Sequence, residues 1–179
     1  MITEIFLIIA VVSIFTVIFN GIEDYSRDKE AMSFREAMDL AELPVVTFYQ
    51  GKEKFNFLLD TGSNHSHISV ETEERIKGVS MTGSENVQGV GGAMAVDRAI
   101  NATIKYKSKS YEVLLLVGEH LSDTFKGIKE TTGVQVHGIL GSGFLSDNRY
   151  VLDFDELIAY SKIWNLWVID IILQNLIFF

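Results

Sequence analysis

The stretch Phe57-Leu58-Leu59-Asp60-Thr61-Gly62-Ser63 decides the fold of this chain. Phe55, Phe57 and Leu59 alternate with their neighbours, which is typical of a strand with one fully buried face. The strand ends at Asp60, and Gly62 permits a tight turn directly after it. The pattern therefore predicts a carboxylate that is oriented and partly desolvated at a strand end, yet still reachable from solvent.

A second motif follows much later in the chain. His137-Gly138-Ile139-Leu140-Gly141 reads as a short buried strand, and Ser142 to Asn148 is predicted to form a short helix. Together with Asp60-Thr61-Gly62-Ser63 at the end of an apolar strand, this motif resembles the retropepsin-like family of aspartic proteases, which have one lobe per chain. The resemblance covers roughly Leu43 to Ser161 and implies a mainly β fold, a closed β-barrel of the acid protease type.

The resemblance also implies a role for each matching residue. Asp60 is expected to be the catalytic carboxylate, Thr61 to brace the loop across a dimer axis, and Gly62 to bond the carboxylate through its amide. Ser63 carries a hydroxyl that could bond the outer carboxylate oxygen and favour the charged form. Ile139, Leu140 and Gly141 are expected to support the loop from behind. No cofactor and no metal are implied.

The segment from Gly83 to Val96 is rich in glycine. In the family that the chain resembles, a β-hairpin flap at this position closes over the substrate, and glycines allow backbone to approach a peptide closely. Gly89, Val90, Gly91 and Gly92 are therefore the expected substrate-binding residues. The alternative is an ordinary glycine-rich loop.

The chain contains Asp-Thr-Gly only once. Peptide hydrolysis by carboxylates needs two of them close together, sharing one proton. Asp153 and Asp155 lack the following Thr-Gly or Ser-Gly and do not repeat the motif. The consistent interpretation is a homodimeric endopeptidase in which each chain supplies one Asp60 across a two-fold axis, with a protein or peptide as substrate.

Composition excludes several other classes of protein. Fifteen Lys and Arg against 24 Asp and Glu give a net charge of −9, which disfavours nucleic acid as a partner. The absence of cysteine excludes disulfides, thiol catalysis and cysteine–zinc sites. His65 and His67 on a strand would place both imidazoles on one face, which is compatible with a metal site. The favoured alternative is a pair of histidines that lie at the surface or line the cleft.

The run from Ile5 to Ile22 carries no charge. As a helix it would extend roughly 27 Å, close to the thickness of a bilayer core. A cleaved signal peptide is the alternative, although no Lys or Arg precedes the run and no small-residue cleavage site follows it. We therefore expect a single-pass anchor, and a membrane-anchored family member of bacterial type. The following Arg27, Lys29 and Arg35 favour a cytoplasmic catalytic domain by the positive-inside rule.

The expected organisation has four parts: a membrane anchor helix at 1–22, a juxtamembrane linker and helix at 23–42, the protease domain at 43–161, and a hydrophobic tail of unknown role at 162–179. Alternation further predicts hairpins at 44–60, 99–117 and 149–161, and the polar segment from Gly118 to Gln135 is expected to be irregular.

Two rival functions remain open at this level. One is a non-catalytic peptide-binding or dimerisation module that keeps the fold. The other is a structural membrane protein in which Asp60-Thr61-Gly62 is accidental.

Overall fold

A computed structural model describes residues 9, 11–16, 31–89 and 92–161, with the backbone alone for residues 82–97 within these ranges. Residues 11–16 are helical. The remaining elements follow in chain order: β1 (Met32–Ser33), α2 (Arg35–Ala41), β2 (Val45–Gln50), β3 (Glu53–Asp60), β4 (Ser66–Ile68), α3 (Val70–Glu73), β5 (Gly78–Gly89), β6 (Gly92–Tyr106), β7 (Lys109–Val117), α4 (Leu121–Thr132), β8 (Gly138–Gly141), α5 (Ser142–Asp147), β9 (Tyr150–Asp153) and β10 (Ile158–Ser161).

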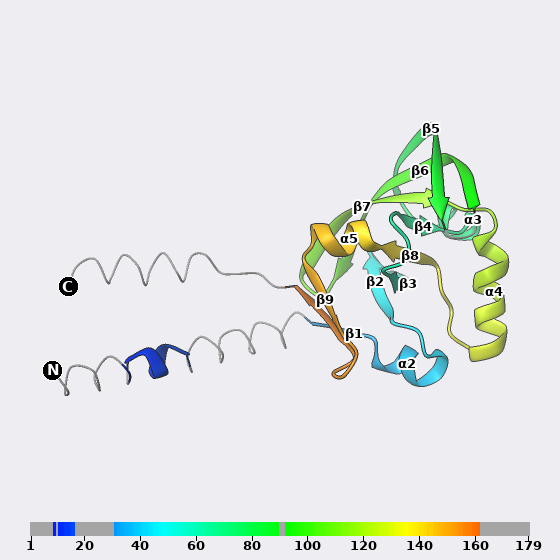
Figure 1. Ribbon diagram of the computed structural model, residues 1–179. Helices are drawn as coiled ribbons and strands as arrows, with labels where there is room; N and C mark the ends of the chain where they lie inside the picture. The colour runs from blue at the N-terminus through cyan, green and yellow to red at the C-terminus, as the bar shows by residue number, and fades with distance from the viewer. Residues whose placement is uncertain (1–8, 10, 17–30, 90–91, 162–179) are drawn as a thin grey trace.

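The main sheet is seven-stranded, in the order β2-β3-β8-β4-β7-β6-β5. An additional antiparallel pairing of β2 with β6, at Tyr49 and Lys105, closes the sheet into a barrel and leaves β5 outside the ring. Figure 1 shows β5 and β6 as a long hairpin at the top of the barrel, with α4 along one side. The predicted mainly β, closed architecture is confirmed.

The crossing of β8 gives the barrel its particular topology. β8 lies between β3 and β4, parallel to β3 and antiparallel to β4. β8 is therefore inserted between two strands that lie about 70 to 85 residues before it in the sequence. Gly138 and Gly141 allow this close passage, because a Cβ at either position would lie 2.6 Å or less from a backbone oxygen of the segment beside it.

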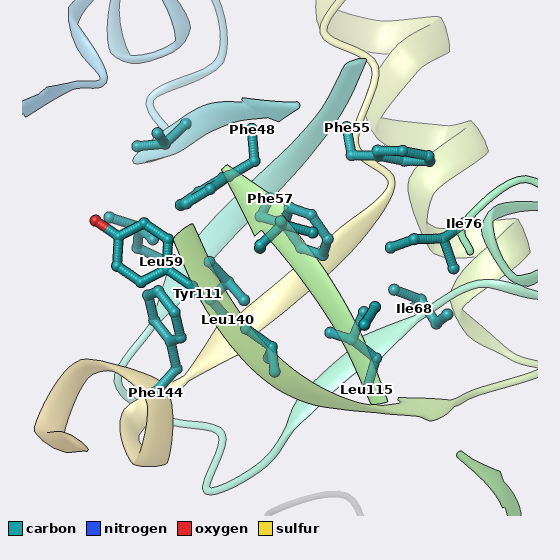
Figure 2. Close-up of a cluster of buried hydrophobic side chains, with 14 of the residues drawn as sticks. Phe48, Phe55, Phe57, Leu59, Ile68, Ile76, Tyr111, Leu115, Leu140 and Phe144 are labelled. Atoms are coloured by element: carbon teal, nitrogen blue, oxygen red, sulfur yellow. The ribbon is translucent and has the colours of Figure 1, made fainter. Parts of the chain in front are cut away.

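The barrel interior is filled by aromatic and aliphatic side chains (Figure 2). The inward residues of β3, namely Phe55, Phe57 and Leu59, are at most 3% exposed, as the alternation in the sequence predicts. Phe48 of β2 meets the ring of Phe57 edge to face, at a centroid distance of 5.8 Å. Burying a side chain of this size contributes about 1.5–3 kcal/mol, so the interior dominates the stability of the domain.

A second, smaller cluster covers the outer face of β3 and β8. Leu58 and Ile139 pack there against Leu121 and Phe125 of α4. The expectation of an irregular segment from Gly118 to Gln135 is therefore wrong for Leu121–Thr132, which is helical. Leu121, Phe125 and the half-buried Ile128 recur at helical spacing, and their burial stabilises the helix despite Gly127.

The small sheet runs in the order β1-β10-β9 and lies at one end of the barrel (Figure 1). Met32 pairs with Ala159, and both Met32 and the following Phe34 are fully buried in the main core. The end of the predicted linker at 23–42 thus contributes a strand, a helix, and Met32 and Phe34 of the main core to the domain. β9 and β10 form the hairpin predicted near the C-terminus.

The predicted anchor from Ile5 to Ile22 and the tail at 162–179 lie largely outside the described residues. Among the residues that are described, no helix is long and apolar enough to cross a membrane.

Candidate active site

Asp60 is the last residue of β3 and lies half-buried where the strand meets a tight turn. Its Oδ1 accepts a hydrogen bond of 2.8 Å from the Gly62 N–H. A hydrogen bond of this kind fixes the orientation of a carboxylate. The amide of Gly62 therefore orients Asp60, as the sequence suggested, while Thr61 and Gly62 remain exposed.

The hydroxyl of Ser63 does not donate a hydrogen bond to Asp60 in this chain. It donates a hydrogen bond of 2.7 Å to the carbonyl oxygen of His65, two residues further along. The hydroxyl proton is used inside the loop, so the expected bond from Ser63 to the outer carboxylate oxygen is absent from the described structure. Ser63 instead stabilises the turn that follows the carboxylate.

The chain from β8 into α5 holds this loop from behind. Asp60 pairs with Gly141 at the end of the two parallel strands. The Ser142 N–H then donates to the Ser63 carbonyl at 2.7 Å, and the Gly143 N–H donates to the Asn64 carbonyl at 3.2 Å. Figure 1 shows α5 leading directly away from this junction. The expected supporting motif and the Asp60 loop are thus brought together.

Gly141 itself sits in a narrow space. A Cβ there would lie 2.4 Å from the His65 carbonyl oxygen and 2.7 Å from that of Ser63. The Gly141 N–H donates to the buried Ser66 hydroxyl at 3.2 Å. Only a residue without a side chain lets β8 approach the loop this closely. Ile139 faces the outer cluster and Leu140 the main core, so each of the three expected supporting residues has its own surroundings.

The histidines near Asp60 differ in environment. His65 is exposed and precedes β4, whereas His67, within β4, is 7% exposed and its Nδ1 has no hydrogen-bond partner among the described residues. Burial lowers the pKa of His67, and His65 and His120 lower it further, against an opposing effect of Asp60. His67 is therefore neutral at ordinary pH. Within the described ranges no group of three or more His, Asp or Glu side chains is arranged to hold a metal ion.

The β5–β6 hairpin occupies the position predicted for a flap, and Gly89 pairs with Gly92 at its end. Val90 and Gly91 lie outside the described residues. The second arm of the hairpin is continuous from Gly92 to Tyr106, so the strand predicted at 99–106 is part of the same element. The base of the hairpin therefore extends directly into the barrel.

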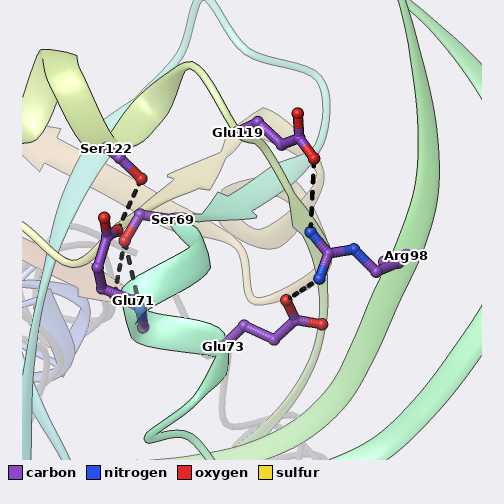
Figure 3. A network of polar contacts seen from close by, with 7 residues as sticks. Ser69, Glu71, Glu73, Arg98, Glu119 and Ser122 are labelled. Carbon is purple, nitrogen blue, oxygen red and sulfur yellow. Dashed lines mark hydrogen bonds and ion pairs between the residues drawn. The ribbon is translucent and has the colours of Figure 1, made fainter.

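An ion-pair network, not anticipated from the sequence, connects the hairpin base with α3 (Figure 3). Arg98 of β6 contacts the Glu73 carboxylate at 2.6 Å and that of Glu119 at 3.8 Å. On the other side of α3, the Ser122 hydroxyl donates to Glu71 at 2.7 Å. These partners are far apart in sequence and of ordinary polar type, so no local pattern distinguishes them.

The fold and the loop together define a mainly β barrel protein that presents one carboxylate on a glycine turn. The family model for aspartyl proteases matches residues 45–144, more than half of the chain. The chain therefore belongs to the aspartyl protease family, a family of peptide-cleaving hydrolases.

Among solved structures, the EIAV protease complexed with the inhibitor HBY-793 is 26% identical, over 61% of this chain and 90% of that one. Its TM-score is 0.43, which is too low to establish a common fold. No curated protein matches the chain.

Proposed function

We propose that the protein is an aspartic endopeptidase of retropepsin type, in which two Asp60 carboxylates from two copies of the chain activate water. The observation that carries the proposal is the loop geometry: Asp60 ends a buried strand, accepts the Gly62 amide and is supported by β8. Membership of the aspartyl protease family supports the same reaction class.

A second carboxylate from within the chain is disfavoured by the structure of the β9–β10 turn. Oδ1 of Asp153 accepts the Asp155 N–H at 3.1 Å and the Glu156 N–H at 3.0 Å. Asp153 is thus engaged in its own turn, and Asp155 is exposed on the same turn, in the small sheet. A second copy of Asp60 supplies the missing group more simply.

The chemistry follows from placing two like charges close together. Both carboxylates cannot ionise cheaply, so the pair holds one proton. The ionised member accepts a proton from water, and the protonated member donates to the carbonyl oxygen of the scissile peptide. The water oxygen then attacks the carbonyl carbon. We assign substrate binding to the hairpin end at Gly89, Val90, Gly91 and Gly92, in line with the resemblance.

Mixing of active and inactive chains tests the proposal. Asp60→Asn preserves shape and removes the ionisable group, so it should abolish hydrolysis of a model peptide without unfolding the protein. An excess of Asp60→Asn chains, under conditions of subunit exchange, should reduce activity more steeply than dilution, because mixed dimers carry one carboxylate. Activity that falls only in proportion to wild-type chains would show that each chain has a complete site. Binding of a statine-type inhibitor without any hydrolysis would favour a peptide-binding module.

We also propose that Ile5 to Ile22 anchors the protein in a membrane as a single-pass helix of a bacterial-type family member, with the catalytic domain on the cytoplasmic side. The support is the uncharged run and the basic residues that follow it. An anchor would also raise the effective concentration of chains for dimerisation. Retention in the membrane after carbonate extraction tests the anchor, and protease accessibility of the domain in sealed vesicles tests the side.

A further inference from the structure

A concave surface lies toward the opposite end of β3 from Asp60. It is a groove of about 1050 Å³ whose lining includes Thr47, Tyr49, Lys54, Asn56, Lys105 and Lys107, and we call it the basic groove. Along β3, Asn56 and Asp60 are separated by roughly 14 Å at about 3.4 Å per residue. The basic groove is therefore distinct from the candidate active site, but a single polypeptide is long enough to reach both.

The floor of the basic groove is the outer face of the β2–β3 hairpin. Thr47 pairs with Asn56, and Tyr49 pairs with Lys54, so these side chains project from the same face. The Thr47 hydroxyl donates to Asn56 Oδ1 at 2.8 Å, and Asn56 Nδ2 donates to the Gln135 carbonyl at 2.8 Å. The floor is thus polar and internally bonded, which gives the groove a defined shape.

One edge of β2 opens into this groove. The Leu59 N–H donates to the Pro44 carbonyl, so the even-numbered residues of β2 direct their backbone groups toward β3. Val45, Thr47 and Tyr49 direct theirs to the other edge. In the described part of the chain that edge pairs with a strand only at Tyr49, opposite Lys105. On the other side of Thr47, the Val45 N–H already donates to the Leu43 carbonyl at 2.9 Å, so the part of this edge that is open to an added strand is the backbone of Thr47.

The charge of the basic groove is opposite to that of the chain. Three of its lining residues are lysines and one, Glu36, is acidic, whereas the chain as a whole carries −9. Lys54 lies 5.9 Å from the centre of the Tyr49 ring, and the Lys107 ammonium donates to the Ala31 carbonyl at 3.1 Å. Leu40 of α2, 59% exposed, adds an apolar wall. The groove thus offers positive charge, apolar surface and a free strand edge together.

We propose that the basic groove binds an extended, acidic stretch of polypeptide, which adds to the free edge of β2 and places its carboxylates beside Lys54 and Lys105. Backbone hydrogen bonds to the edge around Thr47 supply affinity, and the alternating side chains of the added strand supply specificity. This interaction does not depend on the catalytic role of Asp60.

Binding is best measured on the full-length Asp60→Asn chain in a neutral detergent, so that no probe is cleaved. The probe is a fluorescein-labelled peptide of alternating valine and glutamate, followed by fluorescence anisotropy. The double variant Lys54→Glu, Lys105→Glu should raise the Kd about 10-fold or more, because two attractive contacts become repulsive. The matched control, Lys77→Glu with Lys126→Glu, makes the same change of charge on exposed lysines outside the groove and should change the Kd by less than about 2-fold.

Four further results decide the proposal. A probe N-methylated at every residue should not bind, since it has no backbone N–H to donate to a strand edge. Equal weakening by both double variants, or no binding of the acidic probe to the parent chain, would overturn the proposal. The proposal would also be overturned if the parent chain bound phosphatidylglycerol vesicles but no peptide, and the Lys54→Glu, Lys105→Glu variant lost the vesicle binding. The basic groove would then be a lipid-binding surface. Circular dichroism of each variant verifies that the fold is retained.

Discussion

Gly141→Ala is the most direct perturbation of the candidate site that leaves its chemical groups unchanged. The added Cβ would lie 2.4 Å from the His65 carbonyl oxygen and 2.7 Å from the Ser63 carbonyl oxygen. Both contacted atoms are backbone, so neither can rotate away as a side chain could. The loop that follows Asp60 must therefore move away from β8.

The structure sets the size of the expected effect. Relieving the overlap weakens the bonds from the Ser142 and Gly143 amides to the loop, at 2.7 and 3.2 Å, each worth about 1 kcal/mol. Together with overpacking we expect a loss of about 2–3 kcal/mol in the free energy of unfolding, and a fall in Tm of roughly 6–15 °C. Displacement of Asp60 by about 1 Å should lower kcat about 100-fold.

Two glycines provide a graded comparison, measured by thermal unfolding and by hydrolysis of a model peptide. A Cβ at Gly143 would lie 3.0 Å from the Asn64 carbonyl oxygen, so Gly143→Ala should have an intermediate effect. A Cβ at Gly127, inside α4, would contact nothing within 4 Å, and Gly127→Ala should stabilise the protein by about 0.5–1 kcal/mol with unchanged kcat. A Gly141→Ala protein with wild-type Tm and kcat would refute the assignment of β8 as the support of the Asp60 loop.

Three further predictions test separate parts of the structure. Arg98→Gln should raise KM with little change in Tm, since a partly exposed ion pair contributes about 0.2–1 kcal/mol. Arg75→Gln, which breaks the 2.9 Å pair with Glu53 of β3, should leave KM unchanged. Equal KM values for the two variants would show that the hairpin base does not contribute to substrate binding. Burial, followed by the charges of Arg75 and Lys129, lowers the pKa of His137 to about 4. Because the unfolded chain then binds a proton at a higher pH than the folded chain, the free energy of unfolding should fall by about 1–2 kcal/mol between pH 6.5 and pH 4, after allowance for screening of a half-buried ring. His137→Gln should remove that part of the pH dependence in chemical denaturation, and an unaltered profile would contradict the prediction. Ser66→Ala leaves the buried Gly141 amide without its hydrogen-bond acceptor, so it should lower the free energy of unfolding by about 1–3 kcal/mol in chemical denaturation. An unchanged free energy of unfolding would show that the amide finds another partner.

Much of the barrel was predictable from local pattern. Strict alternation in Phe55, Phe57 and Leu59 identifies β3 and its buried face, because the side-chain period of a strand is two. The position of Asp60 at a glycine turn follows from the same stretch. The short apolar segment between Gly138 and Gly141 likewise indicates a buried strand. These features are encoded by neighbouring residues, so the sequence predicts them without knowledge of the fold.

Other elements form only because of contacts between distant segments. α4 lies in a polar stretch interrupted by Gly127, and its helical state depends on burying Leu121 and Phe125 against β3 and β8. β1 is two residues long and exists because β10 lies beside it. β1 has no local signal that predicts it, and for α4 the local signal is limited to the helical spacing of Leu121, Phe125 and Ile128.

The same division holds for the candidate site. The sequence by itself determined the reactive group, a carboxylate on an Asp-Thr-Gly turn, because residue type and turn chemistry are local. Only the tertiary structure decided what surrounds it: the passage of β8 behind the loop, the use of the Ser63 hydroxyl on His65, and the ion pair that joins Arg98 to α3. Those contacts depend on strand order and register, which arise when separate segments pack together and are not properties of any one segment.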